Sequence, residues 1–90
     1  MRYVINYIME FDTTAKTLLR KMVMHNVCGG KHHGLDDLKH GFPSHEKGNV
    51  EKAVKKLVKA NYILKHPAHY GYQYSVNHDM IDEIQKILEE

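Results

Sequence analysis

The sequence predicts a mainly helical α+β fold in a single small domain. Apolar side chains recur at intervals of three and four residues in several segments, which is typical of amphipathic helices. Two short runs of branched and aromatic residues, at 62–64 and 72–76, flank a turn and indicate a β-hairpin. A chain of 90 residues, 42% hydrophobic and 27% charged, has a globular composition and room for one core. We therefore expect residues 12–77 to form that core, with an extension at 1–11 and a last helix at 78–90.

The first helix is predicted to begin after Asp12. The side chains of Asp12, Thr13 and Thr14 carry oxygens that can cap a helix. Apolar residues then repeat at helical spacing over about three turns; they are Ala15, Leu18, Leu19, Met22 and Val23. The pair Gly29-Gly30 is expected to stop this helix, and residues 31–33 form a short connector that can be extended.

A short helix and a long helix follow. Residues 35–38 fit one or two helical turns, and Pro43 breaks that helix because it disfavours the helical conformation of Phe42. Ser44 is expected to cap the next helix, which we predict over residues 45–60. Its apolar line is the clearest in the chain; the members are Val50, Ala53, Val54, Leu57 and Val58.

The hairpin and a last helix complete the expected elements. Asn61 ends the long helix, residues 67–71 form the turn of the hairpin, and the strand at 72–76 alternates apolar and polar side chains. Residues 77–79 (Asn-His-Asp) then cap the last helix. The apolar face of this helix consists of Met80 or Ile81, Ile84, Ile87 and Leu88.

This order of elements resembles the winged-helix form of the helix-turn-helix domain. The resemblance covers residues 13–77 and is carried by the short helix and turn at 35–43, the helix pattern at 50–63 and the hairpin after it. Asn61 stands where many winged-helix proteins have a glycine, and asparagine tolerates the left-handed conformation. Small archaeal winged-helix proteins of unassigned role have phrases similar to Gly29-Gly30-Lys31-His32, Gly41-Phe42-Pro43-x-His45 and Tyr70-Gly71 with Asn77. The resemblance implies a protein that binds double-stranded DNA without catalysis, such as a transcriptional regulator.

The charge pattern favours a polyanionic partner. Residues 39–77 hold seven basic and two acidic side chains, whereas 78–90 hold one basic and five acidic ones. On the long helix, a step of 100° per residue places a polar face opposite the apolar line. The candidate contacts there are His45, Lys52, Lys55 and Lys59, with Lys56 and Asn49 along one side and Ser44 at the start. Such a helix fits the major groove, where asparagine and lysine can meet base edges. The alternative is a lysine face that only keeps the protein soluble.

The hairpin would be the wing of such a domain. It adds Lys65, His69 and Tyr70 as candidate contacts to nucleic acid. Because the turn holds one lysine and no arginine, a wing that contacts RNA or protein is the alternative. An RNA- or ribosome-associated protein and a protein-interaction module are therefore the alternative functions. We expect Tyr72 and Tyr74 to pack onto the core.

The sequence predicts no cofactor, no metal site and no enzyme. His25, Cys28, His32 and His33 form the tightest cluster of metal-ligating side chains, but a single cysteine gives no paired-ligand signature, and metal binding there stays open. The chain has no P-loop, no G-x-S-x-G and no H-E-x-x-H motif. We therefore name no catalytic residue.

The remaining expectations concern location and assembly. The lone Cys28 cannot form an internal disulfide, which favours a reducing, cytoplasmic setting. The apolar stretch at 3–11 is too short to span a bilayer, so no membrane partner is expected. The apolar segments at 1–11 and 78–90 are a candidate homodimer surface, and the alternative is that both complete the core of the monomer.

Overall fold

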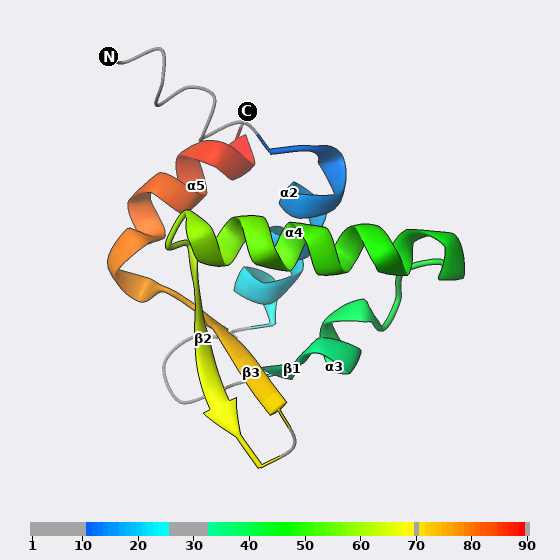
Figure 1. Cartoon of the computed structure of the whole chain (residues 1–90). Helices are drawn as coiled ribbons and strands as arrows, with labels where there is room; N and C mark the ends of the chain where they lie inside the picture. Colours follow the sequence, from blue (N-terminus) through cyan, green and yellow to red (C-terminus); the bar gives the residue numbers. More distant parts are fainter. Residues whose placement is uncertain (1–10, 26–32, 70, 90) are drawn as a thin grey trace.

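A computed structural model describes residues 11–25, 33–69 and 71–89. Figure 1 gives the labels of its helices and strands. In chain order they are α2 (Thr13–Met24), β1 (His33–Gly34), α3 (Leu35–Lys39), the 3-10 helix η1 (Ser44–Glu46), α4 (Lys47–Lys59), β2 (Ile63–Ala68), β3 (Gly71–Val76), the 3-10 helix η2 (His78–Met80) and α5 (Ile81–Glu89). The fold is α+β and mainly helical, as the sequence predicts.

The strands of the described residues form an antiparallel sheet in the order β1-β3-β2. The central strand β3 pairs with β2 from Ile63 opposite Val76 to Ala68 opposite Gly71. On its other side β3 pairs with β1, where His33 lies opposite Tyr74. Because β1 has two residues, most of the sheet is the hairpin of β2 and β3, which extends away from the helices (Figure 1).

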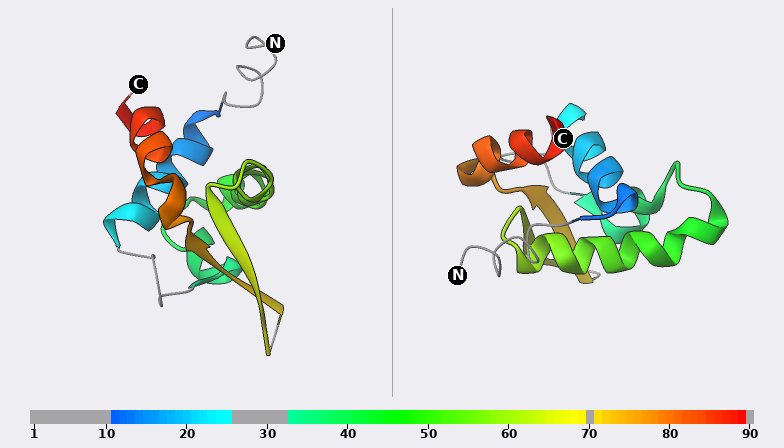
Figure 2. Two further views of the ribbon diagram at one scale, coloured as in Figure 1. Left: turned by 90° about the vertical axis from the view of Figure 1, so that its left-hand side faces the viewer. Right: turned by 90° about the horizontal axis from the view of Figure 1, so that it is seen from above.

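The core lies between the helices and the base of the hairpin. α2 packs against both α4 and α5, and α3 packs against α4. The left view of Figure 2 shows α4 end-on at one side, α5 at the other and α2 between them. The largest fully buried side chains come from α2, α4, α5 and the base of the hairpin; they are Leu18, Leu19, Met22, Val50, Leu57, Tyr62, Ile63, Val76 and Ile84. α3 adds Leu38, which is 6% exposed. One continuous core therefore fixes the orientation of α4 relative to the hairpin.

The start of α2 confirms the predicted cap. Asp12 has an extended backbone, and its Oδ1 accepts a hydrogen bond of 2.9 Å from the backbone N–H of Ala15. This bond satisfies a donor that the first turn of a helix leaves without an intrahelical partner. α2 ends at Met24, and the predicted stop at Gly29-Gly30 lies outside the described residues.

The start of the long helix differs from the prediction. α4 begins at Lys47, and residues 44–46 before it form the single 3-10 turn η1. Pro43 takes the N-cap position of η1, so Ser44 is already inside that turn and its side chain makes no capping bond. The expectation that Ser44 caps the long helix is therefore wrong. The proline ring, with φ fixed near −65°, is suited to the residue that leads into a helix.

Asn61 ends the long helix in the left-handed conformation, with φ 67°. The N–H of Asn61 donates to the carbonyl oxygen of Val58 at 3.0 Å, and the N–H of Tyr62 donates to that of Leu57 at 3.0 Å. These bonds satisfy carbonyls of the last turn and direct the chain into β2. The predicted role of Asn61 is confirmed. Its own carbonyl oxygen accepts a bond of 2.7 Å from Nδ2 of Asn77.

The hairpin is longer than predicted. Residues 67–71 were expected to form the turn, but β2 continues through Pro67 to Ala68 and β3 begins at Gly71. Pro67 is tolerated because β2 is an outer strand, where a missing N–H need not cost a bond to a neighbour. Gly71 has a φ of 126°, a conformation that suits glycine at the tight turn.

The last helix closes the fold against α2. Oδ1 of Asn77 accepts a bond of 3.2 Å from the N–H of Asp79 and so caps the 3-10 turn η2, which leads into α5. Asn77 is therefore a cap as predicted, whereas His78 and Asp79 lie inside η2. Ile84 and Ile87 are buried, and Nη2 of Arg20 on α2 donates to the carbonyl oxygen of Leu88 at 3.1 Å.

Candidate nucleic-acid interface

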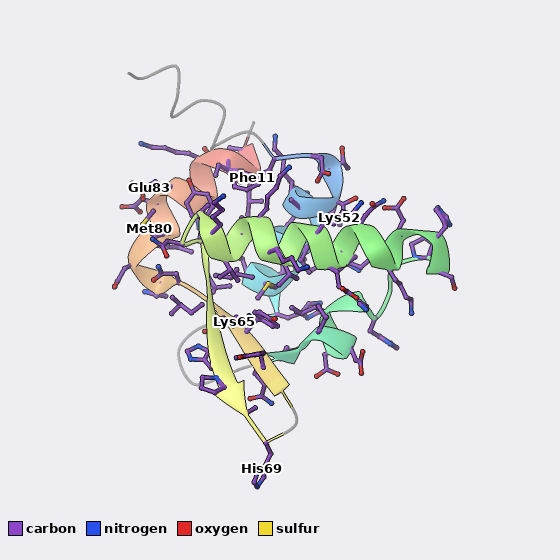
Figure 3. The ribbon with its side chains drawn as sticks, viewed as in Figure 1. Phe11, Lys52, Lys65, His69, Met80 and Glu83 are labelled. Carbon is purple, nitrogen blue, oxygen red and sulfur yellow. The ribbon has the colours of Figure 1, made fainter. Side chains whose placement is uncertain are left out.

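α4 has two faces of opposite character. Val50, Ala53, Val54 and Leu57 are buried along its inner side. The outer side carries lysines at every turn, and all of them are exposed; they are Lys52, Lys55, Lys56 and Lys59. Figure 3 shows Lys52 at the upper edge of this helix. The predicted cationic face is therefore present, and we call these four residues the lysine face.

The lysine face keeps its charge free for a partner. Among residues 11–25, 33–69 and 71–89, none of its four ammonium groups takes part in an ion pair or side-chain hydrogen bond. The lysine that is paired belongs to α3: Nζ of Lys39 lies 2.7 Å from Oε2 of Glu51 at the edge of α4. This hydrogen bond and the charge of Lys39 lower the pKa of the Glu51 carboxyl. The one acidic side chain within α4 is thus paired with a lysine of another helix, and the charge of Lys55 also lowers its pKa, by a smaller amount.

The hairpin adds a cation beside the lysine face. Lys65 on β2, Lys55 and Lys59 line a groove of about 170 Å³ whose floor includes Val58 and Tyr74. In Figure 3 Lys65 lies directly below α4. Nζ of Lys65 is 4.1 Å from the ring centroid of Tyr72, a cation–π contact across the hairpin. Of the predicted hairpin contacts, the structure therefore brings Lys65 to the same side of the molecule as Lys55 and Lys59.

The start of α4 contains a contact network that the sequence analysis missed. Oε1 of Glu46 accepts a bond of 3.2 Å from Oγ1 of Thr14 on α2 and one of 3.5 Å from Nδ2 of Asn49. Oε2 of Glu46 lies 3.7 Å from Nε2 of His45. Ser44, His45 and Asn49 are all exposed here, so these predicted contacts stay accessible. Glu46 places a negative charge among them.

The tip of the hairpin tests two further expectations. His69 is exposed and points away from the body of the molecule (Figure 3), whereas Tyr70 lies outside the described residues. Tyr74 is buried as expected, and desolvation raises the pKa of its phenol. Tyr72 is 53% exposed, so the prediction that it packs onto the core is wrong. It lies nearer the tip of the hairpin, lines an open hollow with residues 35–37 of α3, and packs against the Lys65 side chain.

The histidine cluster is only partly within the described residues. His25 and His33 are described, whereas Cys28 and His32 are not. Within the described ranges, no three histidine, cysteine, aspartate or glutamate side chains lie close enough together to hold a metal ion.

The two segments of the candidate dimer surface behave differently. Residues 1–10 lie outside the described residues, but Phe11 is buried and its ring centroid lies 5.6 Å from that of Tyr62. On α5, Ile84 and Ile87 face the core of their own chain. Phe11 and α5 thus contribute to the core of the monomer, which was the alternative to a dimer contact.

Comparison with known proteins gives no relative. No model of a protein family, no curated protein and no solved structure matches the chain. The partner must therefore be inferred from the chemistry of the lysine face.

None of the helices in the described part of the chain combines the length and the hydropathy needed to cross a bilayer.

Proposed function

We propose that the protein binds double-stranded DNA without catalysis and that α4 inserts into the major groove. The observation that carries this proposal is the lysine face, four exposed ammonium groups on one side of a helix with no carboxylate partner in the described residues. A single α-helix fits the major groove of B-DNA, and lysines along it can neutralise phosphates on both sides. A transcriptional regulator is the role that such binding suits.

The layout of the elements supports this mode of binding. The order α2, β1, α3, α4 and hairpin is compatible with that of a winged helix, in which the third helix and the hairpin approach the duplex together. In the left view of Figure 2, α4 and the hairpin lie toward the same side, while α5 lies at the opposite side. Lys65 would then contact the phosphates next to the groove that α4 occupies.

The distribution of charge supports one orientation on the duplex. The first turn of α5 carries Asp82 and Glu83, both exposed, and Glu89 lies near its end. A carboxylate next to a phosphate backbone would be repelled, so DNA should approach the side of α4 rather than that of α5.

The test measures affinity for a duplex over a series of salt concentrations. Each lysine that contacts a phosphate contributes roughly 0.9 to the slope of log affinity against log salt. We expect the triple variant Lys52→Gln, Lys55→Gln, Lys59→Gln to flatten this slope by about 2 to 3 units. The matched control, Lys16→Gln, Arg20→Gln, Lys86→Gln on α2 and α5, changes the net charge equally and should leave the slope nearly unchanged.

The same series on duplex RNA and single strands distinguishes the alternatives. The major groove of A-form RNA is deep and too narrow for side chains to read, so a protein that inserts α4 should prefer DNA. Tighter binding to RNA would replace the proposal by an RNA- or ribosome-associated function. If both triple variants flatten the salt slope equally, binding depends on the net charge of the protein and not on the lysine face. No binding to any nucleic acid would leave a protein-interaction module whose lysines are solvated.

A further inference from the structure

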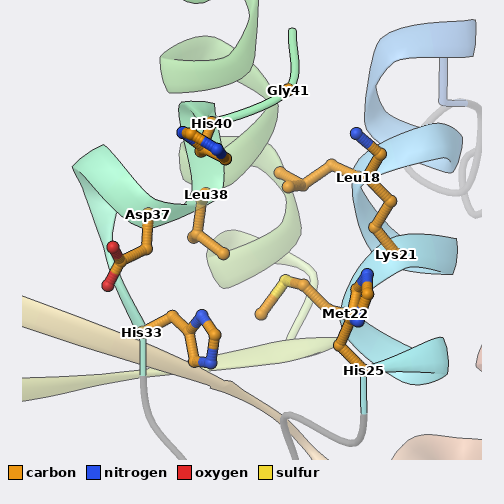
Figure 4. Close-up of a pocket in the computed structure, with 9 residues that line it drawn as sticks. All are labelled: Leu18, Lys21, Met22, His25, His33, Asp37, Leu38, His40 and Gly41. Atoms are coloured by element: carbon orange, nitrogen blue, oxygen red, sulfur yellow. The ribbon is translucent and has the colours of Figure 1, made fainter.

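A pocket of about 340 Å³ lies between α2 and α3 (Figure 4). None of its lining residues belongs to the lysine face. The side chains of Leu18, Met22 and Leu38 converge on its floor, and each is more than nine-tenths buried. Pockets of this volume with an apolar floor are typical sites for small organic molecules. The floor therefore favours a ligand with an apolar body.

Polar groups surround this floor. Figure 4 shows the imidazoles of His25 and His33 at one end of the pocket and that of His40 at the other. The carboxylate of Asp37 also belongs to the lining, but in Figure 4 it is turned away from the floor. Imidazole nitrogens can donate or accept a hydrogen bond, so the rim is suited to a polar substituent on the ligand.

A cation lies at the mouth of the pocket. Nζ of Lys21 is 4.6 Å from the ring centroid of Phe42. It also lies 3.0 Å from the place that a Cβ at residue 41 would occupy, so Gly41 permits this close approach. Lys21 is half-buried, and within the described ranges no carboxylate pairs with it. A partly desolvated ammonium group of this kind favours an anion next to it.

We propose that this pocket binds a small aromatic carboxylate. The ring lies on Leu18, Met22 and Leu38, and the carboxylate faces the ammonium group of Lys21 with the imidazoles as further hydrogen-bond partners. The volume of about 340 Å³ accommodates one or two fused rings. The proposal does not depend on DNA binding, because neither α4 nor the hairpin contributes a residue to the lining.

The test is an NMR titration of the full chain with 2-naphthoate and with its neutral amide, 2-naphthamide. We expect 2-naphthoate to shift the methyl signals of Leu18, Met22 and Leu38 and to bind more tightly than the amide. Replacing Lys21→Gln should weaken the binding of 2-naphthoate about two- to fivefold, as expected for loss of one partly exposed charge contact, and leave the binding of the amide unchanged. Lys16→Gln, the same change on the same helix but outside the lining, is the control.

Three results would overturn the proposal. The first is that neither probe shifts the three methyl groups. The second is that acid and amide bind the unaltered protein equally, a comparison that needs no variant to fold. The third is that Lys21→Gln and Lys16→Gln weaken the binding of 2-naphthoate to the same extent, since the affinity would then depend on net charge alone.

Discussion

α4 and α5 are built alike on the inside and differ on the outside. Leu57 on α4 and Ile84 on α5 are both fully buried, and each helix places an apolar stripe in the same core. The outward side of α4 carries only cations over its last two turns, whereas α5 exposes mainly carboxylates. The inner stripes therefore serve the fold, and the difference in what the protein can bind comes from residues that the fold does not need.

The largest expected effect concerns the inner stripes. Leu57→Ala and Ile84→Ala should each lower the free energy of unfolding by about 2 to 5 kcal/mol, because each removes buried methyl groups and leaves a cavity. Urea denaturation measures this change. The exposed substitution Lys56→Ala serves as control and should stay within about 0.5 kcal/mol. A nearly neutral Ile84→Ala would show that α5 is an appendage and that the two helices are not equivalent in the core.

The next effect concerns sequence recognition at the start of α4. If Asn49 reads a base edge, Asn49→Ala should cost about 1 to 3 kcal/mol of binding on a selected DNA site and little on random duplex. Lys59→Ala, at the other end of α4, should weaken binding to both equally, because phosphate contacts carry no sequence information.

Selection from a random duplex pool supplies the site for this measurement. If no sequence is enriched over the pool, direct readout by Asn49 and His45 is wrong, and the lysine face binds without sequence preference. Glu46→Gln is the informative second variant, because Glu46 contacts both residues. It should alter which sequences are enriched, whereas a purely structural role would change stability alone.

A smaller effect on DNA affinity is expected from the exposed carboxylates of α5. Replacing Asp82→Asn, Glu83→Gln and Glu89→Gln should raise affinity for DNA no more than about threefold at 0.1 M salt, because charges beyond a Debye length of roughly 10 Å are largely screened. Binding measurements at two salt concentrations check this. A change as large as that of the triple lysine variant would mean that α5 contacts the duplex and that the proposed orientation is wrong.

The smallest expected effect is a change in the pKa of Glu51, the carboxylate beside the lysine face. Lys39 holds the pKa of Glu51 in the folded protein below its ordinary value of 4.5. The pair therefore stabilises the folded state above pH 4.5. This stabilisation is lost as the pH falls through the pKa that Glu51 has in the folded protein. Replacing Lys39→Met should raise the pKa of Glu51, which an NMR titration of its side chain measures. An unchanged pKa would mean that the contact does not persist in solution.

The sequence predicts most of the elements because their signals are local. The apolar spacing of α4, the cap at Asp12 and the left-handed Asn61 each depend on residues a few positions apart. The same spacing places the lysine face, since a helix with one buried side must expose the other.

The contacts that were not predicted depend on how elements meet. Glu46 and Thr14 are 32 residues apart, and only the packing of α2 against α4 joins them. The pocket below Lys21 likewise arises where α2 faces α3. The exposure of Tyr72 depends on how the hairpin meets α3, where an open hollow lies between them. Pro67 is a misleading signal because its effect depends on whether the strand is central or outer.

The outer position of Pro67 also bears on how copies of the protein behave at high concentration. An outer strand offers a row of unpaired N–H and carbonyl groups to which another chain can add, and such pairing starts aggregation. The hairpin also exposes Leu64 and Tyr72, two apolar side chains that would favour this association. Pro67 lacks the donor that a continuous ladder needs, and Lys65 adds a charge on the same strand. We therefore expect Pro67 to reduce edge-to-edge pairing between copies of the protein.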